Sequence, residues 1–393
     1  MCRCYNFDSN ILKFNVQFIG WILRMREAFM KTIYGISRKA KAEESVVEAT
    51  ANIQSPIGIM FFCDYDQLED VTRLLNEKYP GVPTMGTAGT SYLKETISDS
   101  NILIICAITG GATLDVGVIK RLASSPLSDL YHLTDSIKKV GAERDKTVCL
   151  ELCTNDEERL VSTMNIVLEK HDIPLVGGTV FGTPAGKISY VSVNGRLYED
   201  ACGYMIIKND TGKVHVFREN IYDRADGKAH TATKVNLAKK ELIELDNRPA
   251  ADVYAEETGL TRDKIVDNVL QAPLGRVVDD EVFISSMYEV TPGGSLICYK
   301  RINENDQIYT LKLLDYREIN SSSIDKMKEM CANPSLIFSV NCIYRYLLFQ
   351  NENYLSEFLK GMSQCGPYLG YIGGGEQYKH QHVNQTMVCA IFE

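Results

Sequence analysis

The sequence predicts an α/β (mixed α+β) protein in which mixed β-sheets are covered by helices and built from three strand–helix–strand–glycine-loop repeats in two domains. Three kinds of segment recur in a fixed order and carry this prediction. The first is a seven-residue apolar window that ends in cysteine and is rich in β-branched and aromatic residues, as is typical of buried strands. The windows are residues 57–63, 147–153 and 336–342.

The second recurring segment is an amphipathic helix. A polar turn follows each window, and the apolar residues after it fall on one helical face. These residues are Leu68, Val71, Leu74 and Leu75, then Leu160, Met164, Val167 and Leu168, and finally Leu355, Phe358, Leu359 and Met362. The third segment is a proline with a glycine-rich loop, at residues 82–89, 173–179 and 367–376.

Another strand-like run follows each glycine loop, at residues 101–108, at 188–193 with 202–208, and at 386–392. The last cysteine of each window precedes the first loop glycine by 23, 24 and 28 residues. A crossover of this length favours neighbouring parallel strands with the helix on one face. The loops lack the GKS or GKT ending of a phosphate-binding loop and the GxGxxG dinucleotide fingerprint, which argues against those nucleotide sites.

The composition is that of a soluble globular protein. Of the 393 residues, 45% are hydrophobic and 24% are charged, with a net charge of −9. This acidic balance argues against a nucleic-acid partner and against binding to anionic membranes. The twelve cysteines are scattered without a CxxC pair, which indicates reduced thiols in a cytoplasmic protein. We therefore expect no metal site and no resident cofactor.

The chain is expected to divide into three parts. We interpret residues 1–29 as a dispensable extension that is not native, with a peripheral membrane helix as the alternative. Its apolar stretch, residues 11–23, would rise only about 20 Å as a helix and is too short to span a bilayer. The polar residues 209–248 predict a hinge between a domain with two repeats, residues 30–245, and a domain with one, residues 246–393.

A resemblance to a known family rests on several short pieces in the same order. Residues 244–259 read ELDNRPAADVYAEETG and resemble the junction of FIST proteins. The other matching pieces are 174–178, 273–275, Asn341-Cys342 with Arg345, Gly375-Glu376 and 384–388. The similarity runs from about residue 33 to the C-terminus. The first two glycine loops depart from the family pattern more than the C-terminal segment does, which implies that the C-terminal domain keeps more of the ligand contacts.

The resemblance implies a sensory protein for signal transduction that binds a small ligand such as an amino acid, without covalent chemistry. The sequence has no recognisable kinase, cyclase or DNA-binding segment. We therefore expect signalling in trans to a separate output protein, such as a chemoreceptor, a histidine kinase or a cyclase, with residues 208–245 as the hinge.

The predicted ligand site lies at the end of the third repeat. Arg345 offers a planar fork for a carboxylate, and Glu376 offers a partner for an ammonium group. We expect Arg345 and Glu376 to lie in loops at the carboxyl edge of the sheet, where ligands of open α/β sheets bind. The full predicted set is Cys342, Arg345, Gly374, Gly375, Glu376, Asn384, Gln385 and Thr386. The alternative is a structural ion pair between Arg345 and Glu376.

Two other functions are alternatives to reversible ligand binding. A thiol enzyme would use Cys342 as its nucleophile, activated by Arg345 and His382. A haem-based gas sensor would use His380 and His382, which would share one side of a strand. A scaffold whose repeats serve protein contacts only is a third possibility. No catalytic motif favours an enzyme.

Overall fold

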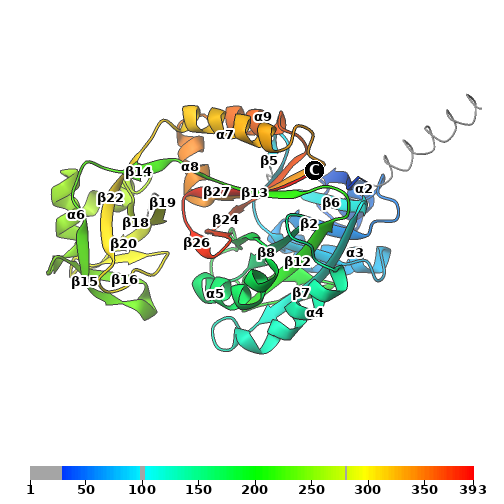
Figure 1. Cartoon of the computed structure of the whole chain (residues 1–393), viewed down its shortest axis with the longest axis horizontal. Coiled ribbons are helices and arrows are strands. Elements are labelled where there is room, and N and C mark those ends of the chain that lie inside the picture. The colour runs from blue at the N-terminus through cyan, green and yellow to red at the C-terminus, as the bar shows by residue number, and fades with distance from the viewer. Residues whose placement is uncertain (1–28, 98–101, 279–280) are drawn as a thin grey trace, which may run out of the picture.

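The computed structural model describes residues 29–97, 102–278 and 281–393, and the expected extension and its cysteines Cys2 and Cys4 lie almost entirely outside this range. The described chain has the mixed α/β fold that the sequence predicts. Figure 1 shows a large body and a smaller lobe beside it. The lobe is made of residues between β13 and α7, and the other described residues form the body.

Three modules with the same order of elements build the body. Each has a strand, a helix, a central strand, a second helix, a parallel strand, a short hairpin and a last strand. The first contains β1 (Lys31–Ser37), α2 (Ala42–Ala49), β2 (Gly58–Cys63), η1 (Tyr65–Gln67), α3 (Leu68–Lys78), β3 (Thr84–Ala88), β4 (Ser91–Leu93), β5 (Thr96–Ile97) and β6 (Leu103–Gly110). The second contains β7 (Ala112–Lys120), η2 (Pro126–Asp129), α4 (Leu130–Val140), β8 (Thr147–Cys153), α5 (Glu157–Leu168), η3 (Glu169–His171), β9 (Leu175–Thr179), β10 (Val191–Val193), β11 (Arg196–Tyr198) and β12 (Ala201–Asn209).

The third module follows the same order but is interrupted by the lobe. It contains β13 (Val214–Asn220), α7 (Tyr316–Met330), β23 (Leu336–Cys342), α8 (Ile343–Asn351), α9 (Leu355–Ser363), β24 (Tyr368–Gly373), β25 (Glu376–Tyr378), β26 (Gln381–Val383) and β27 (Thr386–Phe392). The repeat is therefore longer than the sequence suggested, because each central strand is preceded by a further strand and helix. The helix α8 has no equivalent in the first two modules.

The three body sheets are linked by a cyclic exchange of hairpins. Their strand orders are β1-β6-β2-β3-β10-β11, β7-β12-β8-β9-β25-β26 and β13-β27-β23-β24-β4-β5. The parallel pairs are β2 with β3, β8 with β9 and β23 with β24, as the crossover lengths predicted. The last two strands of each sheet come from another module, so the three modules close into a ring.

One face of each sheet packs into a shared core, and the other face packs under its own helices. The shared core draws on central strands of all three modules, including Phe62, Leu150 and Phe338. Separate apolar clusters lie under α2 and α3, under α4 and α5, and under α7, α8 and α9. The predicted apolar helix faces are confirmed by the burial of Val71, Leu75, Leu160, Met164, Val167, Leu168, Phe358, Leu359 and Met362.

The lobe is a nine-stranded sheet with one helix and three 3₁₀ turns. Its elements are β14 (Tyr222–Arg224), β15 (His230–Asn236), η4 (Leu237–Lys239), β16 (Glu241–Leu245), β17 (Arg248–Pro249), α6 (Ala250–Thr258), η5 (Arg262–Lys264), η6 (Val266–Asn268), β18 (Leu274–Val278), β19 (Glu281–Ser285), β20 (Met287–Val290), β21 (Leu296–Cys298) and β22 (Gln307–Leu313). It has its own apolar core around Leu242, Tyr254 and Ile308.

Three expectations from the sequence need correction. Residues 209–248, which were predicted as a hinge, are mostly strands, because β13 pairs along its whole length with β27 and β14, β15 and β16 belong to the lobe sheet. Arg345 lies in the first turn of α8 and not in a loop. The third window is also out of step with the first two by one residue. Cys63 and Cys153 face the helices that cover their sheets, whereas in the third window Asn341 takes that orientation and Cys342 does not. Among the described residues, no helix has the length and apolar character needed to cross a membrane.

Candidate ligand site at the junction of lobe and body

The carboxyl ends of two parallel strand pairs meet where the lobe contacts the body. The Thr179 N–H at the end of β9 donates to the Gly375 carbonyl at 3.0 Å, and the Gly374 N–H donates to the Thr179 carbonyl at 3.0 Å. Gly374 and Gly375 directly follow β24. Ligands of open α/β sheets bind at this kind of edge, so the side chains around it form the candidate site.

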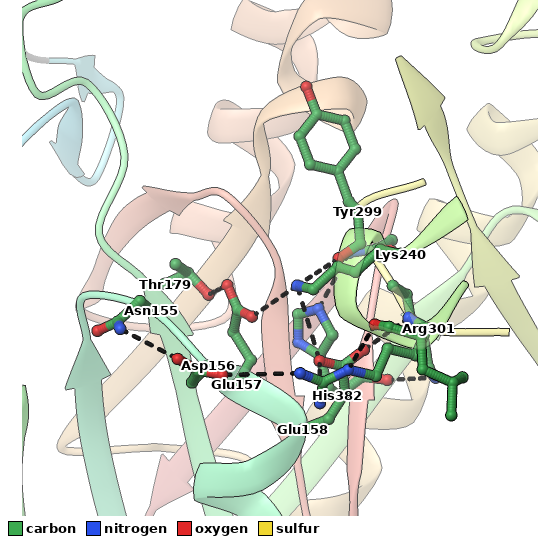
Figure 2. Close-up of polar contacts among 12 residues, drawn as sticks. Asn155, Asp156, Glu157, Glu158, Thr179, Lys240, Tyr299, Arg301 and His382 are labelled. Atoms are coloured by element: carbon green, nitrogen blue, oxygen red, sulfur yellow. Dashed lines mark hydrogen bonds and ion pairs between the residues drawn. The ribbon is translucent and has the colours of Figure 1, made fainter. Parts of the chain in front are cut away.

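A chain of polar contacts crosses this junction from the lobe into the body (Figure 2). Lys240 Nζ lies 3.2 Å from Glu157 Oε2, and Thr179 Oγ1 donates to Glu157 Oε1 at 3.2 Å. Gln377 Nε2 lies 3.3 Å from Thr179 Oγ1 and 3.0 Å from His382 Nδ1. We call these five residues, together with Lys300, the junction site. Its six members are Glu157, Thr179, Lys240, Lys300, Gln377 and His382.

The His382 ring fixes the orientation of a neighbouring amide. The amide groups of Gln377 and Asn384 lie 3.0 and 3.4 Å from its two ring nitrogens. A neutral imidazole has one N–H and one acceptor, so it accepts a hydrogen bond from only one of the two amide NH2 groups. Burial lowers the pKa of His382 to about 4, which keeps the ring neutral.

Opposite charges surround this network. Figure 2 shows Glu157 and Glu158, in the first turn of α5, facing Lys240 and Arg301 of the lobe. Glu158 Oε2 lies 3.7 Å from Lys240 Nζ and 3.6 Å from Arg301 Nη1, and Glu158 Oε1 accepts from the Arg301 N–H at 2.7 Å. Burial alone would raise the pKa of Glu157, but nearby positive charge, including Lys240, holds it below its usual value. The amino end of a helix also favours these carboxylates.

Lys300 is a buried amine at the same junction. Its Nζ donates to the His382 carbonyl at 2.6 Å, which ties the lobe to β26. Burial, reinforced by the charge of Arg276, lowers the pKa of Lys300 to about 7. A substantial fraction of this amine is therefore neutral near pH 7, and a ligand anion beside it would favour the charged form.

Three tyrosines form a partly exposed aromatic surface beside the network. Ring centroids lie 4.6 Å apart for Tyr288 and Tyr299, and 5.6 Å apart for Tyr299 and Tyr344. Tyr288 and Tyr299 belong to the lobe and remain 41% and 39% exposed, whereas Tyr344 belongs to α8. Lys240 Nζ donates to the Tyr299 carbonyl at 2.8 Å. The aromatic surface and the charged network therefore adjoin.

Six of the eight residues expected to bind ligand gather near this junction. The Thr386 N–H and hydroxyl donate to Glu376 Oε2 at 3.0 and 2.7 Å. Burial raises the pKa of Glu376 to about 8, while hydrogen bonds from Thr386 and Cys342 oppose that rise. Gly375 lies against His382 and Asn384, where a Cβ would collide with the imidazole. Gly374 lies beside it, so this group comprises Cys342, Gly374, Gly375, Glu376, Asn384 and Thr386.

The other two residues face elsewhere. Arg345 is completely buried and pairs with Glu219 of β13, while its Nε donates to Asn341 Oδ1 at 3.2 Å. Its guanidinium stacks on Phe349 and Phe358, at 4.6 and 5.2 Å from the ring centroids. The alternative, a structural ion pair of Arg345 with Glu376, is therefore not the arrangement found, because Arg345 pairs with Glu219. Gln385 holds the lobe, donating to Ser286 Oγ at 2.7 Å and to the Val269 carbonyl.

Several buried side-chain oxygens near the junction have no hydrogen-bond partner among the described residues. They are Glu158 Oε2, Glu376 Oε1, Gln377 Oε1, Asn384 Oδ1 and Gln385 Oε1. A buried polar atom without a partner costs about 1–3 kcal/mol, so this concentration marks a place where a polar ligand would gain hydrogen bonds.

The two histidines expected to share a strand face are separated. His380 lies in the turn of the hairpin, is exposed, and has Nδ1 2.9 Å from Glu169 Oε1, whereas His382 is buried. They therefore do not form a pair of ligands for haem. Within the described residues, no group of three or more His, Cys, Asp or Glu side chains has the geometry of a metal site.

Cys342 lacks the environment of a nucleophilic thiol. It is buried, and burial together with the nearby Glu376 raises its pKa well above its usual range. Reactive thiols have lowered pKa values and open access.

Sequence reasoning missed the residues that give the junction its charge. Glu157 and Glu158 carried a local signal, because they open a helix directly after a predicted strand. Lys240, Lys300 and Arg301 carried none, since they belong to the lobe and reach the body only through the tertiary fold.

The fold and the junction site define a multi-module α/β protein with a polar site between two parts of one chain. Models of the FIST N domain and of the FIST C domain match residues 57–248 and 250–379. The chain belongs to the FIST family, whose domains serve sensory and signal-transduction roles, and a sensory role fits it. No curated protein matches the chain significantly.

Proposed function

We propose that this protein reversibly binds a small zwitterionic ligand of the amino-acid type at the junction site and signals in trans to a separate output protein. The observation that carries the proposal is the charge arrangement across the junction. Carboxylates of the body, Glu157 and Glu158, face cations of the lobe, Lys240 and Arg301. An ammonium group fits the carboxylates and a carboxylate fits the cations.

Binding exchanges contacts that now hold the lobe to the body. A ligand ammonium beside Glu157 competes with Lys240, and a ligand carboxylate beside Lys240 or Lys300 competes with Glu157 and with the His382 carbonyl. The ligand therefore favours one position of the lobe over another by its differential affinity. The partly exposed rings of Tyr288 and Tyr299 offer a surface for its side chain.

The output is proposed to be a separate protein of the cytoplasm, such as a chemoreceptor, a histidine kinase or a cyclase. A lobe that shifts between two positions presents two different surfaces to such a partner. The proposal assigns no covalent chemistry to the chain. The burial and raised pKa of Cys342, and the separation of His380 from His382, favour reversible binding over the thiol-enzyme and haem alternatives.

Isothermal titration calorimetry with the twenty common amino acids and a panel of other metabolites tests this function. Glu157→Gln and Lys240→Met each remove one charge of the site, and we expect each to weaken ligand affinity at least tenfold. Arg73→Met is the matched control, since it breaks an exposed ion pair with Asp70 far from the junction. Flat traces for the whole panel, or equal affinity in all three variants, would overturn the proposal.

A further inference from the structure

A long groove runs along the outer edge of β13. One hollow of about 650 Å³ includes Thr147, Val214 and His215 in its lining. A second hollow of about 490 Å³ includes Phe217, Arg218 and Phe283. The two hollows share Val216, Met330, Lys379 and His380, so they form one continuous groove.

Edges of three different sheets converge on this groove. β13 ends one body sheet, β26 ends another, and β19 ends the lobe sheet. The β25–β26 hairpin contributes Tyr378, Lys379, His380 and Gln381 to the wall, and β19 contributes Glu281 and Phe283. Arg218 bridges body and lobe through Glu281 at 3.0 Å. The groove therefore has one wall on the lobe and one on the body.

The floor of the groove carries backbone groups that point away from the sheet. The Val214 N–H donates outward to the Asp145 carbonyl at 2.8 Å. In an antiparallel pair, alternate residues direct their backbone groups to the neighbour, so Val216 and Arg218 direct theirs away from β27 as well. Tyr378 Oη donates to the Val216 carbonyl at 3.4 Å, and no backbone partner for either residue is found among the described ones.

The recessed position of this edge selects what can pair with it. Open strand edges are templates for another strand. The β25–β26 hairpin and the lobe wall this edge, so a single extended segment reaches β13 more readily than the folded edge of a second copy does. A strand opposite the part of β13 from Val216 to Asn220, beyond the N–H that Asp145 already occupies, spans about 16 Å. Phe217, Met330 and Tyr378 would pack against apolar side chains of such a segment.

We propose that the groove along β13 binds an extended segment of the output protein by β-strand addition, with apolar side chains at alternate positions. In β-strand addition, main-chain hydrogen bonds give affinity, and pockets for alternate side chains give specificity. The inference rests on the proposed signalling in trans and adds the surface at which the partner docks.

The β25–β26 hairpin connects this groove to the ligand site. Gln377 and His382 of the hairpin belong to the junction site, while Tyr378 and Gln381 between them line the groove. Lys300 of the lobe holds the His382 carbonyl, and Glu281 of the lobe holds Arg218. A lobe shift therefore moves one wall of the groove, which couples the affinity for the segment to the affinity for the ligand.

An equivalent groove offers an internal control. The second module has a hollow of about 310 Å³ lined by Val116 and Val118 of β7 and by Asn194 of the β10–β11 hairpin. Val116 lies opposite Met205 as Val216 lies opposite Ala390. The lobe contributes no residue to that hollow, so we expect it to bind no output segment.

The experiment uses the full chain and an array of overlapping peptides of about 12 residues, long enough to cover β13. The peptides tile the histidine kinases, chemoreceptors and cyclases of the source organism. Bound peptides are measured by fluorescence anisotropy with wild type, Val216→Pro and Val116→Pro, and mapped by hydrogen exchange. Proline removes one outward N–H and is tolerated on edge strands. Met330→Glu, at an exposed side chain that both hollows share, is a second variant.

We expect at least one peptide that protects the backbone amides of Val216 and Arg218 from exchange and loses tenfold or more in affinity in Val216→Pro and Met330→Glu, but not in Val116→Pro. An array without binders, or binders that protect other residues or are insensitive to both β13-groove variants, would overturn the inference. Amino-acid titration of the same variants separates it from the function above. If Val216→Pro and Met330→Glu bind amino acids as wild type does but no longer bind the peptide, the result supports the groove. If wild type itself binds no amino acid, the sensory proposal fails independently of the groove.

Discussion

Removing the guanidinium of Arg345 is expected to destabilise the protein strongly without acting on the ligand directly. The Arg345→Met variant leaves the carboxylate of Glu219 buried without its cation. Loss of one partner from a buried pair costs about 3–5 kcal/mol. Lost stacking on Phe349 and Phe358 adds to this cost. A domain is stable by only about 5–15 kcal/mol, so the loss is a large fraction of the total.

Urea unfolding followed by circular dichroism measures this loss in wild type, Arg345→Met, Glu219→Leu and the double variant. Because the double variant leaves no uncompensated charge, we expect it to be more stable than Arg345→Met alone. A single variant within about 0.5 kcal/mol of wild type would refute this reasoning. Unchanged stability together with abolished amino-acid binding would instead place Arg345 in the ligand site, as the sequence alone suggested.

Four further predictions concern protonation, packing and thiol access. Burial raises the pKa of Glu376 to about 8 from 4.5, so the folded state binds more protons than the unfolded state between these values and stability falls as pH rises; Glu376→Gln should lose less stability than wild type in urea midpoints compared at pH 5 and pH 8. Burial lowers the pKa of Lys300 to about 7 from 10.5, so the unfolded state binds more protons between these values and stability rises with pH. The free energy of unfolding of wild type should therefore increase relative to that of Lys300→Met from pH 7 to pH 9.5. A difference that stays constant would contradict the lowered pKa. A Cβ on Gly177 would collide with Glu151, whereas one on Gly110 meets open space; thermal melts should show Gly177→Ala destabilised by about 1–3 kcal/mol and Gly110→Ala nearly unchanged. Native Cys342 should resist iodoacetamide at pH 7 and react once urea unfolds the chain, as mass spectrometry of the labelled peptide would detect, and rapid native labelling would revive the thiol alternative.

The repeated strands and helices could be predicted because their signals are local. Each window alternates or runs apolar over seven residues, and each helix has one apolar face. The hairpins could not be predicted, since β4, β10 and β25 have only three residues each and their partners belong to other modules. Their pairing follows from closure of the ring, which no short stretch of sequence encodes.

The candidate site was located in part for the same reason. Gly375 and Glu376 carried a signal because a glycine pair and an acidic residue follow a predicted strand. No sequence signal identified Glu219 as the partner of Arg345, because Glu219 lies 126 residues earlier in the chain. The one-residue shift of the third window had a visible sign. Ser339 and Asn341 are polar at alternate positions and lie on the helix-covered face, where Tyr92 and Tyr368 bind them.

The exchange of hairpins restricts how a chain of this kind can be shortened or recombined. A fragment that stops at residue 248, where the first family model ends, would keep β13 but lose β27, and would keep the β4–β5 hairpin but lose β24. The remaining fragment would carry the β25–β26 hairpin without β9. Neither half can complete its own sheets, so we expect the two halves to be inherited and transplanted as one unit.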